Sequence, residues 1–168
     1  MSYLPDALYE SMERSMPIAC VDFVPVRTDA AGTLQIGLIL RASPFGEVWC
    51  HLGGRVRRGE TIAQALQRHA EDALATSLQL PDDPQPNWVY QWFPPEIAPD
   101  ATWAFGTDPR KHSIALSFTV ALDGEPKPRN EALDFAYFSL DALPDALWPG
   151  CRELITKLTA SLSADVTP

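Results

Sequence analysis

The chain has 168 residues, of which 46% are hydrophobic and 21% charged, as is usual for one folded domain with a core. Its formal net charge of -9 at pH 7 argues against a nucleic acid polymer as partner, because proteins that bind such polymers present basic surfaces. A small phosphorylated ligand is compatible with this charge, since a few arginines or a metal ion reverse the field locally.

The cysteines and the first residues indicate a compartment. Cys20, Cys50 and Cys151 are an odd number without a CxxC pair, which favours reduced thiols over a disulfide framework or a zinc site. Residues 1–14 include acids and lack the basic start and apolar run of a signal peptide. No apolar stretch approaches the roughly 20 residues that cross a bilayer. We therefore expect a cytoplasmic protein with no membrane partner.

The first half of the chain predicts two helices separated by three strands. A short amphipathic helix is expected over residues 4–15, and Pro17 ends it, because proline disfavours helical geometry in the residue before it. Apolar residues then recur at helical spacing from Glu60 to about Leu78, with no proline or glycine among them. The three strands between these helices are expected at 18–26, 33–41 and 48–52.

The second half predicts three more strands and a closing helix. A long loop, 94–111, is rich in proline and aspartate, and loops of this length inside a domain are often functional. No repeat or linker divides the chain, so one domain is expected over residues 1–168. The strands are expected at 88–93, 112–122 and 135–139, and the helix at 151–162.

A glycine pair followed by a loop and the long helix carries the most information. Gly54, Gly59, Glu60 and Arg68 are spaced as in the Nudix box, and residues 53–76 resemble that motif. In the family, this loop–helix–loop holds a divalent metal against a nucleoside diphosphate. The resemblance implies the Nudix fold, an α+β architecture in which a mixed sheet is sandwiched between helices (α/β/α). It also implies that the two glycines and the glutamate are structural residues of the box.

The box departs from the family at its acidic positions. His69, Asp72 and Ala73 stand where three glutamates are expected, and Ala75 stands at the closing glycine. Positions 69, 72 and 73 share one helix face, because residues three and four apart are neighbours. Mg²⁺ prefers oxygen ligands, so an imidazole replaces a carboxylate poorly. We expect any Mg²⁺ or Mn²⁺ to be weakly bound.

Beyond the box, the chain resembles the GDP-mannose mannosyl hydrolase branch of the Nudix family over most of residues 1–143. In that branch, a glycine carbonyl, a helix glutamate and a late-loop glutamine hold the metal, arginines bind the diphosphate, and a histidine is the base. Chains of that branch pair with one another. The matching features are Arg14-Ser15-x-Pro17, Asp22-Phe23, Arg41, Trp49, Gly53-Gly-Arg-Val56, Gly106-Thr-Asp108, His112 and Ser139-x-Asp-Ala-Leu143.

The resemblance assigns roles to individual residues. Metal would be held by Gly53 and Glu131, with Asp72 as the carboxylate that remains on the helix. The branch's helix glutamate and base histidine fall on Ala73 and Ala132, which can perform neither role. The arginines that match the diphosphate ligands are Arg41, Arg55 and Arg68. Alternatively, Arg68 pairs with Glu60 to brace the loop against the helix.

Three residues are candidate catalytic groups. Asp22 lies in an apolar strand, where an unpaired carboxylate would be costly, so it is expected to pair with an arginine or to face the site. His69, on the metal face, is a possible base, a ligand for a softer metal or an inert remnant. His112, at the mouth of the long loop, is the other candidate base, because imidazole exchanges protons near neutral pH.

Together these features predict an enzyme that hydrolyses a nucleoside diphosphate linked to a sugar or another group, assisted by a divalent metal. The alternative is a catalytically impaired Nudix module that binds or senses a nucleotide or nucleotide sugar, as the loss of the helix glutamate and the base histidine suggests. A scaffold without a ligand is disfavoured by the retained arginines. The expected partners are a small nucleotide derivative and a second copy of the chain, paired through residues 1–20.

Overall fold

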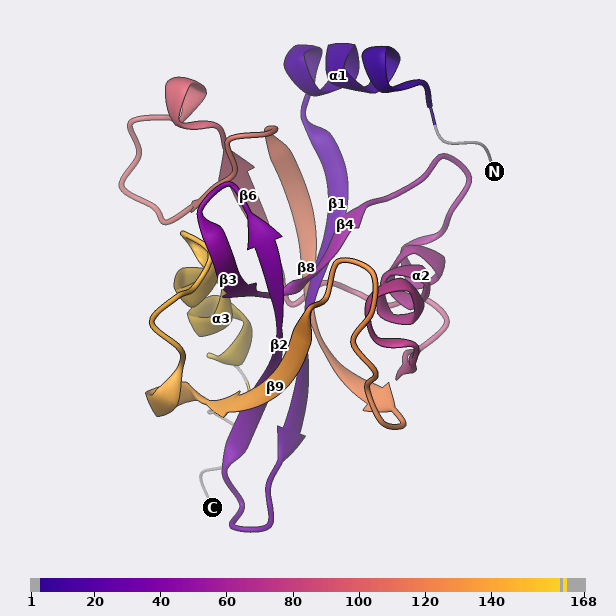
Figure 1. Cartoon of the computed structure of the whole chain (residues 1–168), viewed down its shortest axis with the longest axis vertical. Helices are drawn as coiled ribbons and strands as arrows, with labels where there is room; N and C mark the ends of the chain where they lie inside the picture. Colours follow the sequence, from indigo (N-terminus) through magenta and orange to yellow (C-terminus); the bar gives the residue numbers. More distant parts are fainter. Residues whose placement is uncertain (1–3, 161, 163–168) are drawn as a thin grey trace.

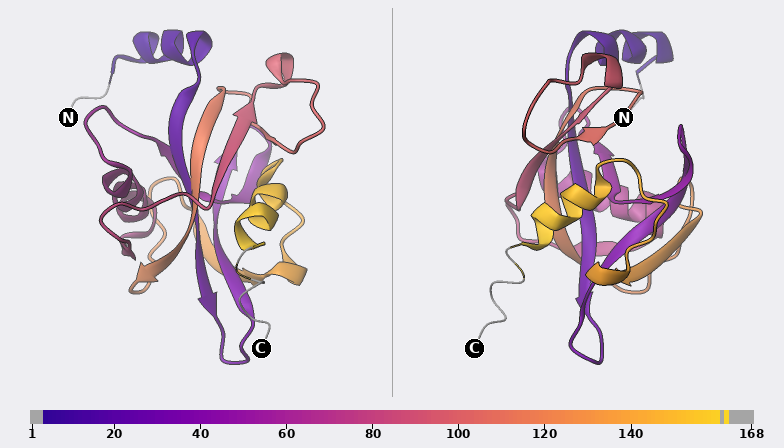
Figure 2. Two further views of the ribbon diagram at one scale, coloured as in Figure 1. Left: turned by 180° about the vertical axis from the view of Figure 1, so that it is seen from behind. Right: turned by 90° about the vertical axis from the view of Figure 1, so that its left-hand side faces the viewer.

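A mixed, curled sheet with helices on both sides forms the centre of the computed structural model, which describes residues 4–160 and 162 (Figure 1). Helices α2 and α3 lie on opposite sides of the central strands, and α1 lies across one end (Figures 1 and 2). The helices are α1 Asp6–Ser15, α2 Ile62–Leu74 and α3 Cys151–Thr159, with 3-10 turns η1 Pro95–Ile97 and η2 Leu140–Ala142. The strands are β1 Ile18–Thr28, β2 Leu34–Ser43, β3 Gly46–Cys50, β4 Leu52–Arg55, β5 Ser77–Gln79, β6 Trp88–Phe93, β7 Gly106–Thr107, β8 Ser113–Asp123 and β9 Asp134–Ser139.

Strand β1 organises the sheet because its two ends have different neighbours. Its first part pairs with β4 on one side and runs parallel to β8 on the other. Its last three residues pair instead with β2, which leads to β3 and β9. The strand order is β3-β2-β1-β8-β6-β7. Because β3 pairs with β2 whereas β4 pairs with β1, these two consecutive strands diverge at the middle of the molecule. The candidate site lies there.

Helix α2 begins and ends at residues with clear capping roles. The Thr61 side chain accepts a hydrogen bond from the Gln64 backbone, and the Gln64 side chain returns one to Thr61, which forms a capping box. The helix ends at Ala75, which has left-handed geometry at φ 50°. The prediction of a helix as far as Leu78 is therefore wrong at its end. The last residues instead form β5, which pairs with β8.

The glycine pair of the box lies within strand β4 rather than after a strand. Gly53 and Gly54 pair with Asp22 and Val21 of β1. Gly53 has φ +134°, and a Cβ atom there would collide with the backbone carbonyl of Val21. Only glycine fits such an approach, and it brings the backbone of β4 against β1 at the wall of the site.

The other predicted elements are confirmed with small changes at their ends. Strand β6 has the predicted bounds, β1 and β2 extend two residues further, and the closing helix is shorter by three residues. The α+β sandwich implied by the Nudix resemblance is confirmed. Within residues 4–160 and 162, no helix has the length and apolar content that a membrane crossing requires. The three cysteines are buried and form no disulfide.

Candidate functional site

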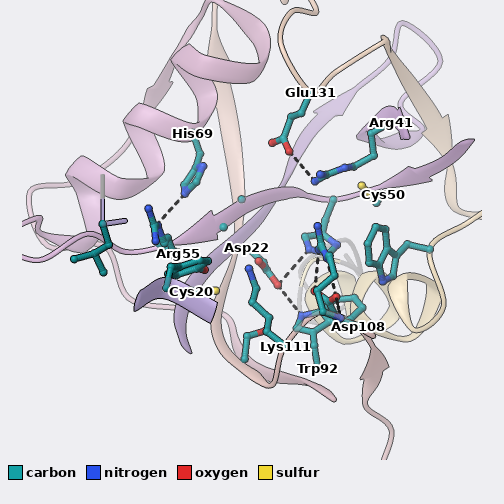
Figure 3. A pocket seen from close by; sticks show the side chains of 18 of the residues that line it. Cys20, Asp22, Arg41, Cys50, Arg55, His69, Trp92, Asp108, Lys111 and Glu131 are labelled. Atoms are coloured by element: carbon teal, nitrogen blue, oxygen red, sulfur yellow. Dashed lines mark hydrogen bonds and ion pairs between the residues drawn. The ribbon is translucent and has the colours of Figure 1, made fainter. Parts of the chain in front are cut away.

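A pocket of about 430 Å³ opens where β3 and β4 separate (Figure 3). Its walls come from β1 to β4, α2, β6, the end of the long loop and the segment before β9. Cationic groups from four separate parts of the chain line it, although the chain as a whole is acidic. These groups are Arg41, His51, Arg55, Arg110 and Lys111.

A buried ion pair lies at the wall formed by β1. The Asp22 carboxylate is 4% exposed, accepts a hydrogen bond from Trp92 Nε1 at 2.9 Å, and lies 3.3 Å from His51 Nε2. The His51 ring stacks on Trp92. Burial disfavours the charged imidazole, but the Asp22 carboxylate outweighs it and raises the pKa of His51 to about 10. His51 is therefore a cation at neutral pH, and Asp22 pairs with it rather than with an arginine.

A second group surrounds the indole of Trp148. The Arg41 guanidinium lies over this ring at 5.9 Å, and its Nη1 is 2.7 Å from the Glu131 carboxylate. The Arg110 guanidinium also lies over the ring, at 4.9 Å. It donates to both carboxylate oxygens of Asp108, at 2.8 and 2.9 Å. Two arginines distant in sequence thus share one aromatic support at the pocket wall.

Arg68 braces the loop of residues 56–61, which joins β4 to α2. Its Nε and Nη2 donate to the two carboxylate oxygens of Glu60 at 2.6 and 2.9 Å, and Nη2 also donates to the Arg55 carbonyl. The hydrogen bonds from Arg68, opposed by burial, lower the pKa of Glu60 to about 2. Arg68 does not line the pocket, whereas Arg55 does. Gly59, at φ +87°, completes the turn before Glu60. This geometry favours the bracing role for Arg68 over the diphosphate-binding one.

The α2 wall of the pocket is formed by His69 and Arg55. His69 Nε2 lies 3.2 Å from the Arg55 carbonyl, and its ring fills the space beside Gly54 that a side chain there would occupy. Burial lowers the pKa of His69, so the ring is neutral at pH 7. In the tautomer that donates from Nε2, the Nδ1 atom remains an acceptor. The Arg55 guanidinium lies over the Tyr9 ring of α1 at 4.2 Å.

The predicted metal ligands do not come together. Gly53 and Glu131 line the pocket, but Asp72 is exposed and outside it. Ala73 is 2% exposed, and Glu131 is paired with Arg41. Among the residues that the structure describes, no group of three or more histidine, cysteine or acidic side chains could hold a metal ion. The side chains present therefore do not fit a tightly bound Mg²⁺, which takes several oxygen ligands in octahedral geometry.

His112 lies away from the pocket wall. Its ring stacks on Phe93 at 4.3 Å, in a cluster that also contains Trp103 and Phe105. Its Nε2 is buried without a hydrogen-bond partner among the described residues, and burial lowers its pKa. Since His112 does not line the pocket, the structure separates it from the other two candidate catalytic residues, Asp22 and His69.

Several residues of the pocket have no role in the sequence analysis. His51 and Trp148 follow no motif, since each enters the pocket only because distant strands meet there. Arg110 and Lys111 offer the one local signal, a basic pair at the end of an aspartate-containing loop in an acidic chain. That signal marks a cationic site but not its position.

Comparison with known proteins identifies the family. Residues 1–153 match the family model described as a domain of unknown function (DUF4916). A structure from Jonesia denitrificans, titled a possible asymmetric diadenosine tetraphosphate (Ap4A) hydrolase, is 30% identical, with a TM-score of 0.75 over 89% of this chain and 96% of that chain. A MutT Nudix hydrolase from Burkholderia pseudomallei is 23% identical, with a TM-score of 0.66 over 86% of this chain and 100% of that chain. A UDP-X diphosphatase is 16% identical, with a TM-score of 0.65 over 95% of this chain and 70% of that chain.

No curated protein matches the chain. The family match covers most of the chain, and the neighbours share its mixed sheet and the placement of its helices. The chain therefore belongs to the DUF4916 family and has the fold of the Nudix hydrolases.

Proposed function

We propose that this protein binds and hydrolyses a nucleoside diphosphate derivative, in which the diphosphate joins a nucleoside to a sugar or another group. The cationic side chains of the pocket are the observation that carries the proposal, because they gather beside four acids in a chain of net charge -9. Arginine suits this ligand, since its planar fork can grip two phosphate oxygens at once. Two neighbours, described as a possible Ap4A hydrolase and as a UDP-X diphosphatase, support a hydrolase that acts on a nucleotide derivative.

His69 is the proposed general base. It is neutral at pH 7, lines the pocket and has an available acceptor at Nδ1 when Nε2 donates to Arg55. Nδ1 takes a proton from a water molecule whose oxygen attacks a phosphorus atom of the diphosphate, and the P–O bond to the leaving group breaks. Arg41 and Arg55 stabilise the negative charge on the phosphoryl oxygens as it develops.

A second candidate function is a binding module that recognises the same ligand without hydrolysing it. The buried Ala73 and Ala132 favour it, because they stand where the GDP-mannose mannosyl hydrolase branch places a metal ligand and a base. Both candidates need the cationic pocket, so ligand binding is their shared requirement and turnover separates them.

Thermal shifts with nucleoside diphosphates and their sugar conjugates test the shared requirement, in EDTA and in Mn²⁺. We expect the ligand to raise the melting temperature and Arg55→Ala to remove most of that shift, with a binding loss of about 1.5–3 kcal/mol, typical of a hydrogen bond to a charged group. Arg58→Ala is the matched control, because Arg58 is exposed and outside this pocket. If no nucleotide shifts the melting temperature, both candidate functions are wrong.

Product release, measured beside the thermal shifts, decides between the two candidates. Hydrolysis that falls in His69→Ala while the nucleotide still binds supports the enzyme and its base. If hydrolysis falls in His112→Ala instead, His112 rather than His69 is the base. Binding without release of any product identifies the binding module.

A further inference from the structure

The indole of Trp148 fixes two guanidinium groups at the pocket wall. The ring is 4% exposed, and its Nε1 donates to the Thr107 carbonyl at 2.7 Å, so it is held by burial and by a hydrogen bond. Arg41 reaches it from β2 and Arg110 from the end of the long loop, and each lies within cation–π distance. Both arginines and the indole line the same pocket. The result is a rigid pair of planar cations facing one space.

Arg41 has a donor that no group in residues 4–160 and 162 satisfies. Its Nε is buried and has no hydrogen-bond partner among the described residues, while its Nη1 contacts Glu131 at 2.7 Å. A buried guanidinium N–H without an acceptor is costly, and such groups normally have a partner. The Glu131 carboxylate thus satisfies the cation only in part. A tetrahedral anion in the pocket offers the guanidinium more acceptor oxygens than one carboxylate does.

The two acids of this group differ in how firmly they are held. The Asp108 side chain is 7% exposed and accepts three hydrogen bonds from Arg110, one of them from its backbone. The Glu131 side chain is 36% exposed, and it contacts Arg41 Nη1 at 2.7 Å. An incoming anion would therefore displace Glu131 and leave Asp108 in place.

We propose that Trp148, Arg41 and Arg110 form a phosphate subsite, and that the Glu131 carboxylate occupies it in the free protein. This inference rests on the proposed function and adds which part of the pocket takes a phosphoryl group and which residue competes with it. A phosphoryl group carries more charge and more acceptor oxygens than the carboxylate that it replaces. The two guanidinium groups of the subsite donate hydrogen bonds to the phosphoryl oxygens, a role that needs no metal ion.

Calorimetry with inorganic pyrophosphate in EDTA tests the subsite. Glu131→Gln should bind pyrophosphate about tenfold more tightly than the wild-type chain, because the competing charge is gone. The double variant Asp108→Asn/Arg110→Gln should bind about tenfold more weakly, because one guanidinium is lost and no unpaired acid remains. Glu47→Gln is the control and should not change affinity, since Glu47 is exposed on β3 and does not line the pocket. Arg110→Lys tests the planar fork without removing the charge.

Each outcome decides something. Unchanged or weaker pyrophosphate binding in Glu131→Gln overturns the subsite, and if nucleotides still bind the wild-type chain, the proposed function stands. An effect of Glu131→Gln that appears only with Mn²⁺, as weaker binding, would make Glu131 a metal ligand and also overturn the subsite. If the pyrophosphate affinities change as expected while no nucleotide binds, the subsite stands and the proposed function fails. If pyrophosphate binds none of the variants, the subsite is wrong.

Discussion

The Asp22–His51 pair places a full charge of each sign beside the pocket without adding net charge to it. Transfer of such a pair from water to a protein interior is costly, and the loss is recovered only when both partners are well hydrogen-bonded. Here the carboxylate also accepts a hydrogen bond from Trp92. Because His51 neutralises it, Asp22 can lie beside an anionic ligand with little repulsion. We therefore expect Asp22 to position the His51 ring and to neutralise its charge.

The raised pKa of His51 predicts a specific dependence of stability on pH. The imidazole is protonated in the folded chain up to about pH 10, and its ordinary value is 6.5. The stabilisation is fully present below pH 6.5 and is lost as the pH rises through 10. Between pH 7 and 8, below the range in which the thiols of the unfolded chain ionise, we expect the free energy of unfolding to fall by about 1–1.4 kcal/mol per pH unit, as linkage requires for one proton. Chemical denaturation across this range measures the slope.

Asp22→Asn should remove that slope, because burial alone lowers the pKa of His51. Asp83→Asn is the control, since Asp83 is exposed and does not line the pocket. The pKa values of His69 and His112 are lowered, so these rings contribute below pH 6.5 and not in the tested range. An unchanged slope in Asp22→Asn would show that this pair does not control it.

Individual residues of the site were predictable only where a motif marked them. Asp22, Arg41 and Arg55 were identified through the Nudix resemblance, and all three line the pocket. His51 and Trp148 were not identified, because each is an ordinary strand or loop residue until β3 and the segment before α3 meet. Local sequence records spacing along one element, whereas this pocket depends on the pairing of distant elements.

At the scale of elements, α2 begins where the resemblance to the Nudix box places a helix, although its exposed acid Asp72 lies outside the pocket. The Glu60–Arg68 brace holds the helix against the loop as the sequence predicts, and the capping box at Thr61 fixes where the helix begins. Its last turn could not be predicted from periodicity, since residues after Ala75 continue an apolar pattern but pair with β8 as β5. The competing strand contact ended the helix early.

Restoring a carboxylate to this face should destabilise the fold. Ala73 is 2% exposed in the core, and its carbonyl accepts a hydrogen bond from the Arg129 backbone. We expect Ala73→Glu to reduce the free energy of unfolding by about 3–5 kcal/mol, as for a buried charge without a partner. Urea denaturation measures the loss. We also expect Mg²⁺ to bind this variant no more tightly than the wild-type chain, for which the dissociation constant should be in the millimolar range.

Ala63→Glu is the matched control for Ala73→Glu. It places the same side chain on the same helix at a half-buried position in the first turn, where the helix dipole favours an acid. Calorimetry that shows micromolar Mg²⁺ affinity in Ala73→Glu, with normal stability, would mean that position 73 faces the pocket and that one carboxylate restores a metal site.

At the scale of the whole molecule, α1 is only lightly covered by the rest of the chain. None of its residues is buried, and Leu8 and Met16 are 50% and 53% exposed. A second pocket, of about 640 Å³, lies between this helix and residues 55–58, and apolar side chains such as Met12 and Met16 line it. Apolar surface of this kind on a single chain is usually covered by a partner. It agrees with the expected dimer through residues 1–20, of which 1–3 lie outside the described residues.

We therefore predict a homodimer that α1 holds together. Light scattering should report twice the 18.5 kDa of one chain at micromolar concentration. The double variant Leu8→Glu/Met16→Glu should reduce this to one chain, because charges replace the apolar contact. Val89→Glu, at an exposed apolar position on β6, is the control and should leave the mass unchanged. A wild-type mass of 18.5 kDa across this concentration range would reject the dimer.

A cationic pocket within an acidic chain also affects how fast a ligand arrives. The proposed anionic ligand would first meet the field of a molecule with net charge -9 and would be attracted only near the cationic side chains of the pocket. The Debye length is about 8 Å at physiological ionic strength, so salt screens the distant repulsion more than the attraction at close contact. Moderate salt therefore accelerates capture of an anionic ligand, the reverse of the behaviour of a basic protein. The distribution of charge thus makes the rate at which the ligand enters, as well as its affinity, depend on the ionic strength of the solution.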